Sequence, residues 1–221
     1  MRRAAPVDWC SLVATLRDQL SRAGLPSVSQ IARFARDPFL ILISTMISLR
    51  TKDDVTLAAC ERLFAIARTP ATMRSLGDEP IADLIYPAGF YRTKGRHIAE
   101  VCSILCERYS GQVPDAIDAL VDLPGVGRKT ANLVLGLGFG IPAICVDTHV
   151  HRIANRRGWV ATRTPEQTEL ELQRMLPRAY WIEINELLVA FGQATCTPTS
   201  PFCSRCPLQT TCRRIGVPRS R

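Results

Sequence analysis

Apolar side chains recur along most of this chain at intervals of three and four residues, the spacing of one face of an α-helix. Such stripes run through residues 9–20, 55–64, 98–106 and 181–191. A continuous apolar run at 38–49 predicts a helix buried on all sides. Proline and glycine interrupt these segments, and no long alternating run indicates a sheet. The pattern predicts an all-α protein of about ten short helices. In the second stripe the expected buried positions are Val55, Leu57, Ala58, Leu63 and Phe64.

The composition is that of a globular protein with a substantial core. The chain has 221 residues, of which 47% are hydrophobic and 22% charged, enough for one large domain or two small ones. Lys and Arg number 28 against 20 Asp and Glu, so the net charge is +8. A basic surface favours polyanionic partners such as nucleic acids, although charge also serves solubility alone.

Nine cysteines indicate either disulfides or a metal site. A chain of this size and apolar content does not need disulfides for stability, and its N-terminus has no secretory signal. No apolar run approaches the roughly 18 residues that a membrane span requires. We therefore expect a cytoplasmic protein in a reducing compartment and not a membrane protein.

Four of the cysteines, Cys196, Cys203, Cys206 and Cys212, form a C-x6-C-x2-C-x5-C pattern in a tail that has no acidic residue after Glu186. Four thiolates around one point repel each other unless a cation neutralises them, as a zinc ion or a four-iron cluster does. Zinc ligands usually occur as two closely spaced pairs, and here only Cys203 and Cys206 form such a pair. The spacing favours iron–sulfur over zinc; the remaining alternative is a set of unrelated buried thiols.

The segment 123–131, LPGVGRKTA, joins two predicted helices through a glycine turn. Gly125 and Gly127 are expected to allow positive φ and close approach of the main chain to a ligand. The N–H groups at the start of the second helix would then form an anion site suited to a DNA phosphate. The spacing is not that of a P-loop. An ordinary turn between helices remains the alternative.

Lys129 falls in the first turn of the second helix. The positive helix end and partial burial both disfavour its charge, so we expect a lowered pKa and a neutral, nucleophilic amine. A phosphate-binding lysine is the alternative. Asp147 precedes another predicted helix, where it could be an N-cap, a functional carboxylate or both. Nearby His149 could contact a phosphate or serve only in packing.

Three motifs together, namely residues 123–131, the VDTH of residues 146–149 and the four-cysteine tail, resemble the endonuclease III family of helix–hairpin–helix DNA glycosylases. The resemblance runs from about residue 38 to residue 212. It implies a two-lobed all-α fold with DNA bound between the lobes. Residues 31–141 would form a six-helix barrel domain with the helix–hairpin–helix motif, and residues 1–30 with 142–221 an iron–sulfur cluster domain. The implied cofactor is a 4Fe-4S cluster on the four tail cysteines, and the implied oligomeric state is a monomer.

The resemblance also implies an activity, that of a bifunctional DNA glycosylase and AP lyase of base-excision repair. Its partner would be double-stranded DNA containing damaged bases or abasic sites, which would associate the protein with the nucleoid. Its substrates would be oxidised pyrimidines. Lys129 would be the Schiff-base nucleophile and Asp147 the essential carboxylate. The expected DNA contacts are Gly125, Val126, Gly127, Arg128, Thr130 and His149. Alternatives are a monofunctional or mismatch glycosylase, whose relatives lack the lysine, and a non-catalytic DNA-binding paralogue.

Two positions depart from the family pattern. Arg50 stands where a glutamine is expected to fill the gap left by the flipped base, and Phe90 stands where a leucine wedge is expected. Arginine can hydrogen-bond or stack on the orphaned base, and phenylalanine can intercalate. We therefore expect Arg50 and Phe90 to contact DNA and to alter the opposite-base preference or the lesion range.

Overall fold

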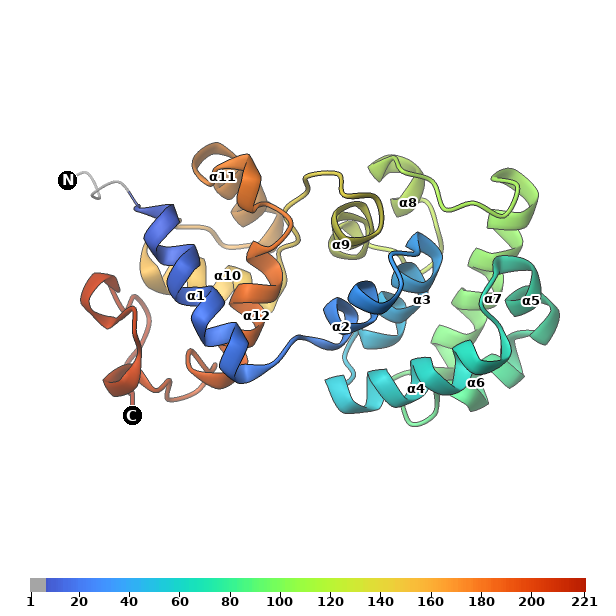
Figure 1. Cartoon of the computed structure of the whole chain (residues 1–221), viewed down its shortest axis with the longest axis horizontal. Coiled ribbons are helices and arrows are strands. Elements are labelled where there is room, and N and C mark those ends of the chain that lie inside the picture. The colour runs from blue at the N-terminus through green and yellow to red at the C-terminus, as the bar shows by residue number, and fades with distance from the viewer. Residues whose placement is uncertain (1–6) are drawn as a thin grey trace. The chain divides into compact units, whose positions relative to one another are not determined.

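The computed structural model describes residues 7–221, and in that range the chain forms helices and irregular connections without a strand (Figure 1). Residues 1–6, with which the predicted cluster domain begins, lie outside the described residues. The range contains twelve α-helices and three short 3-10 turns, somewhat more than expected. The prediction of an all-α protein is confirmed.

The helices separate into two compact units. The central unit comprises Pro26–Ala143, and the terminal unit comprises the described residues up to Leu25 together with Ile144–Arg221. The central unit is therefore one continuous insertion in the other. The predicted domain boundaries fell at residues 30/31 and 141/142, and the identity of these domains as barrel and cluster domain stays a prediction.

The core of the central unit is built around α3 (Pro38–Ser48). Asp37 caps its start by accepting a 2.8 Å hydrogen bond from the Phe39 N–H, and Pro38 occupies the first turn, where its missing N–H costs nothing. All nine residues from Phe39 to Ile47 are buried, so the predicted buried helix is confirmed. The other helices of this unit are α2 (Ser27–Phe34), α4 (Asp53–Ile66), α5 (Pro70–Leu76), α6 (Asp78–Ile85), α7 (Tyr91–Arg108), α8 (Ile117–Val121) and α9 (Arg128–Phe139).

The buried face of α4 differs from the expected one. The structure buries Thr56, Ala59, Cys60, Leu63 and Phe64, whereas two of the expected positions are half-buried and Ala58 is exposed. The helical period places Thr56 above Ala59, Cys60 and Leu63. The Thr56 hydroxyl donates to Lys52 O at 2.9 Å, which allows a polar residue to occupy a core position.

The terminal unit has its own core, formed by α1 (Trp9–Ala23), α10 (Thr148–Arg157), α11 (Pro165–Met175) and α12 (Ile184–Ala194). The 3-10 turns lie at Arg178–Tyr180, Cys203–Arg205 and Gln209–Thr211. Arg17 of α1 forms two hydrogen bonds, of 2.7 and 3.0 Å, with the Glu183 carboxylate, 166 residues away along the chain. Among residues 7–221 no helix is long and apolar enough to cross a membrane.

Helices α6 and α7 approach closely at Gly95, and this contact yields a stability prediction. A Cβ at Gly95 would lie 2.7 Å from Asp78 O and 2.8 Å from Ala82 Cβ. We expect Gly95→Ala to lower the free energy of unfolding by about 1–3 kcal/mol, because overpacking outweighs the gain in helix propensity. Thr93→Ala, on the exposed face of α7, is the matched control and should not destabilise. Urea denaturation followed by circular dichroism measures both; equal stability of the two variants would contradict the prediction.

Candidate functional site

The glycine turn between α8 and α9 is a short hairpin anchored in the central core. Leu123 and Val126 are buried, and Val126 N–H donates to Leu123 O at 3.0 Å. Gly125 has φ of +74°, and a Cβ there would lie 2.6 Å from Nδ1 of His97. The turn and its packing against α7 therefore both require glycine at position 125.

Gly127 differs from the expectation of positive φ. Its φ is −94° with ψ of 174°, an extended conformation that any residue can adopt, so the expectation was wrong at this position. Apart from Gly127 itself and its two chain neighbours, no described residue has an atom within 4 Å of where a Cβ would be. Nothing within the described chain therefore requires glycine there, and the surface beside the start of α9 is open.

The residues after the hairpin differ sharply in exposure. Arg128 is exposed, Lys129 is half-buried at the second position of α9, and Thr130 is 1% exposed. The N-cap residue of this helix is Gly127, which has no side chain to accept from the first N–H groups. The structure thus brings the turn, a basic side chain and a half-buried amine together at one helix N-terminus, as the sequence predicted.

Asp147 is the N-cap of α10. One carboxylate oxygen accepts hydrogen bonds from the N–H groups of His149 and Val150, both at 2.9 Å. Its side chain remains half-buried. The N-cap interpretation is confirmed, while a chemical role for the same carboxylate stays a prediction.

His149 lies against α12 together with an arginine that sequence reasoning missed. Arg152 Nη2 lies 3.1 Å from His149 Nδ1, and the same nitrogen donates to the main-chain oxygens of Gly192 and Cys196 at 3.2 and 2.8 Å. A Cβ at Gly192 would collide with the His149 imidazole. Burial lowers the pKa of the Arg152 guanidinium. Arg152 thus connects the helix that carries His149 to the first cysteine of the tail.

Arg50 and Phe90 form an exposed pair in the central unit. The Arg50 guanidinium lies 5.5 Å from the centroid of the Phe90 ring, a cation–π contact. Both residues have left-handed backbones, with φ of 53° and 58°. The Phe90 side chain is 63% exposed. The structure therefore brings together the two positions that depart from the family pattern.

A buried lysine beneath this pair was also missed. Lys94 is 8% exposed, and burial lowers its pKa to about 8. Its Nζ lies within hydrogen-bonding distance of two main-chain oxygens and one hydroxyl. Its position four residues before Ile98 and seven before Val101 places it on the apolar stripe of α7, a signal that could have revealed it.

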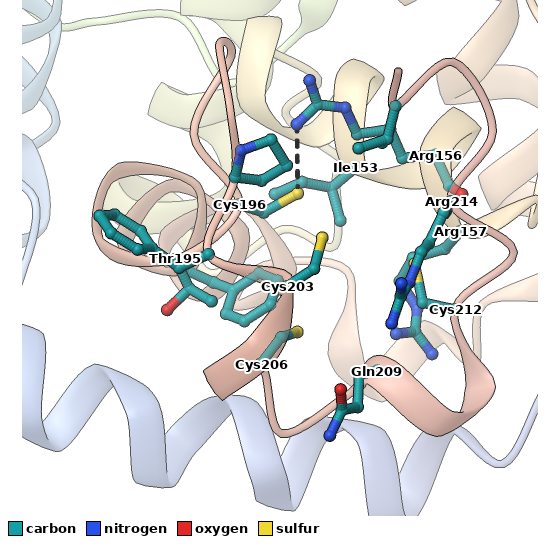
Figure 2. Close-up of a pocket in the computed structure, with 14 residues that line it drawn as sticks. Ile153, Arg156, Arg157, Thr195, Cys196, Cys203, Cys206, Gln209, Cys212 and Arg214 are labelled. Carbon is teal, nitrogen blue, oxygen red and sulfur yellow. Dashed lines mark hydrogen bonds between the residues drawn. The ribbon is translucent and has the colours of Figure 1, made fainter. Parts of the chain in front are cut away.

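The four tail cysteines line one pocket of the terminal unit (Figure 2). Nη1 of Arg156 donates to Cys196 Sγ at 3.5 Å and to Thr197 O at 2.7 Å, and Nη2 donates to Pro198 O at 2.5 Å. Yet no group of three or more His, Cys, Asp or Glu side chains in residues 7–221 is arranged to hold a metal ion. The pocket nevertheless brings all four thiols together.

A second buried arginine lines the same pocket. Arg157 is 7% exposed and lies 5.1 Å from the Trp159 ring centroid. It donates to Leu208 O at 3.2 Å and to the Thr211 hydroxyl at 2.9 Å. Its Nε is buried without a hydrogen-bond partner among the described residues. A buried unsatisfied donor beside four thiols suits an anionic group with several acceptor atoms, which a thiolate-held polynuclear cluster provides.

Comparison with known proteins places the chain in a family. Residues 43–178 match the HhH-GPD superfamily of base excision DNA repair proteins. Endonuclease III of Thermotoga maritima is 49% identical over 194 residues, which cover 84% of this chain and 91% of the relative. The chain thus belongs to the HhH-GPD superfamily of base excision DNA repair proteins and, within it, to the endonuclease III family.

Solved structures agree with this assignment. A non-covalent endonuclease III–DNA complex superposes with a TM-score of 0.81 at 33% identity, covering 94% of this chain and 96% of the other. A trapped endonuclease III–DNA covalent intermediate superposes with a TM-score of 0.79 at 32% identity, covering 94% and 97%. The fold predicted from the resemblance is therefore confirmed.

The double role considered for Asp147 leads to a prediction on stability. Asp147→Ala removes the acceptor of two helix N–H groups and should lower the free energy of unfolding by about 1 kcal/mol. Asp147→Asn keeps an acceptor oxygen and should change the free energy of unfolding by only a few tenths of the change expected for Asp147→Ala. Urea denaturation of both variants tests the cap; an alanine variant as stable as the wild type would show that the cap contributes nothing.

Proposed function

We propose that this protein is a bifunctional DNA glycosylase and AP lyase that removes oxidised pyrimidines from double-stranded DNA and nicks the strand. Membership of the endonuclease III family supports this activity, as does the likeness to a trapped covalent enzyme–DNA intermediate. The observation that carries it is the half-buried amine of Lys129 at a helix start directly after the hairpin.

The hairpin is proposed to bind a DNA phosphate near the lesion. Gly127 has open space where a side chain would be, which leaves room for a phosphate to approach the main chain. Exposed Arg128 would add a charged contact, whereas buried Thr130 would contribute through its main chain. Gly125 and Val126 would shape the turn. On the terminal unit, His149 would contribute a further phosphate contact.

Lys129 is proposed as the nucleophile on a nucleotide flipped out of the duplex, because C1′ cannot be reached within the base stack. Its amine attacks C1′ through the nitrogen lone pair, the glycosidic bond breaks, and the base leaves with the bonding electrons and takes up a proton. The nitrogen lone pair then forms the C1′=N bond while the C1′–O4′ bond breaks, and O4′ takes up a proton. The resulting protonated imine at C1′ acidifies the C2′ protons. Loss of one of these protons breaks the C3′–O bond, and the phosphate leaves in the β-elimination that nicks the strand.

Asp147 is proposed to stabilise the cationic sugar and to assist proton movement. One of its oxygens already accepts two helix N–H bonds, which fix the orientation of the carboxylate. A fixed anion stabilises developing positive charge without reorganising during the reaction. The same residue would therefore serve as helix cap and as catalytic carboxylate.

The four tail cysteines are proposed to hold a 4Fe-4S cluster. Two observations support this: the four thiols line one pocket, and the buried Nε of Arg157 beside them has no hydrogen-bond partner among the described residues. The cluster would supply structural cross-linking of the tail, and we assign it no step of the reaction. Arg156 and Arg157 would offset its negative charge.

The nucleophile is tested by borohydride trapping on duplex DNA carrying one thymine glycol. We expect wild type to yield a covalent protein–DNA band and Lys129→Ala to yield none, because the imine cannot form. The other lysines of this chain are Lys52 and Lys94. Lys52 is exposed, so Lys52→Ala is the matched control and should trap normally.

The other outcomes of trapping have distinct meanings. A band that persists in Lys129→Ala would show that another amine is the nucleophile. Base release without a band or a nick in wild type would indicate a monofunctional glycosylase. DNA binding with neither product would indicate a non-catalytic paralogue.

The cluster proposal predicts the metal content of anaerobically purified protein. Wild type should contain iron and inorganic sulfide in about equal amounts, near four of each per chain, with broad visible absorption. Cys203→Ser should lose most of both, whereas Cys10→Ser, an exposed cysteine of α1, should keep both. One zinc per chain without sulfide would overturn the proposal.

A further inference from the structure

A buried network ties the loop between α3 and α4 to the turn between α6 and α7. Lys94 Nζ donates to the main-chain oxygens of Ile47 and Leu49, each at 2.6 Å, and to Thr51 Oγ1 at 2.9 Å. Thr51 Oγ1 in turn accepts a 3.1 Å hydrogen bond from Gly89 N–H. One ammonium group and one hydroxyl thus join two segments that are about forty residues apart in the sequence.

The partners of Lys94 match an ammonium group completely. An ammonium has three N–H donors, and the structure offers two carbonyl oxygens and one hydroxyl oxygen. The carbonyls lie at the C-terminal end of α3, where the helix dipole favours a positive charge. These contacts offset the cost of burial. They also occupy the side chain fully, so Lys94 does not itself reach solvent or a ligand.

Each tied segment carries one residue in an unfavourable backbone conformation. Arg50 and Phe90 both have positive φ, which costs free energy for residues with side chains and persists only where the surroundings hold it. The two backbones are also in close contact, since a Cβ at Gly89 would lie 2.5 Å from Arg50 O. The network beneath them joins the two segments that carry these exposed side chains.

We propose that Lys94 and Thr51 are positioning residues that hold Arg50 and Phe90 at a fixed spacing, so that both enter the duplex together where the flipped nucleotide leaves its gap. This inference rests on the proposed function. Lys94 and Thr51 touch neither the DNA nor the reacting atoms. Their loss should weaken nucleotide extrusion and opposite-base discrimination while leaving the chemistry at Lys129 intact.

The test compares duplex with single-stranded abasic DNA, because a single strand needs no extrusion. Lys94→Met and Thr51→Val remove the network's donor and its hydroxyl with little change in volume, whereas Thr51→Ser keeps the hydroxyl. Single-turnover strand cleavage is measured on the single strand and on four duplexes, one for each base opposite the abasic site. We expect the first two variants to be about tenfold or more slower on duplex, with flattened opposite-base preference, and nearly unchanged on single strands. Thr51→Ser should behave as wild type.

A second readout does not depend on chemistry. 2-Aminopurine placed opposite the abasic site reports the stacking of the orphaned base through its fluorescence. Wild type and Thr51→Ser should change this fluorescence on binding, and Lys94→Met and Thr51→Val should change it less. If wild type cleaves neither substrate, the proposed function fails, and the fluorescence still decides on the positioning role.

Two results would overturn the proposal. If Lys94→Met and Thr51→Val slow cleavage equally on duplex and single-stranded DNA, and change the fluorescence as much as wild type does, the variants have general structural damage. Duplex rates and fluorescence indistinguishable from wild type in both Lys94→Met and Thr51→Val would show that Arg50 and Phe90 keep their positions without the network.

Discussion

The burial of α3 constrains the whole central unit. Nine consecutive residues of this helix are buried, so other helices must cover it on every side. At its start, the close approach of Gly138 to Pro38, where a Cβ would lie 3.0 Å from Pro38 Cα, sets the position of α9. Lys129 lies near the other end of α9, and the α3 C-terminus meets the Lys94 network. One apolar helix thus places both the candidate nucleophile and the loop of Arg50.

The arginine side chains near the cysteine pocket are held by hydrogen bonds to backbone oxygens as well as by the thiols. Arg152 and Arg156 donate chiefly to carbonyl oxygens of residues 192–198, and Arg157 donates to the segment 208–211. These arginines all lie on α10, the helix that Asp147 begins. The candidate catalytic carboxylate and the frame of the cysteine loops therefore share one rigid element.

The sequence predicted those features that depend on local pattern and chemistry. The all-α class, the buried helix at residues 38–49 and the N-cap role of Asp147 followed from apolar runs and from the capping preference of aspartate. The buried face of α4 did not, because Thr56 satisfies its hydroxyl within its own helix and can replace an apolar residue. Likewise, the extended conformation of Gly127 depends on how the hairpin enters α9, which residue type alone does not specify.

What the sequence could not show are contacts between distant segments. Arg50 and Phe90 were each singled out, but their pairing depends on packing between α3, α6 and α7. The three acceptors of Lys94 are main-chain and hydroxyl oxygens more than forty residues away, and no residue pattern marks a carbonyl group as a partner. Arg157 stands in an unremarkable basic stretch, and only its burial distinguishes it.

The insertion of one unit within the other has a consequence for synthesis on the ribosome. Residues 26–143 are contiguous, so the central unit can complete its core while the rest of the chain is still being made. Helix α1 is made before this unit, yet the partner of Arg17 is made 166 residues later. The apolar face of α1 stays uncovered by α12 during the whole time in which residues 26–143 can fold. Until α12 has been made, α1 therefore lacks the helix that covers its apolar face in the folded protein.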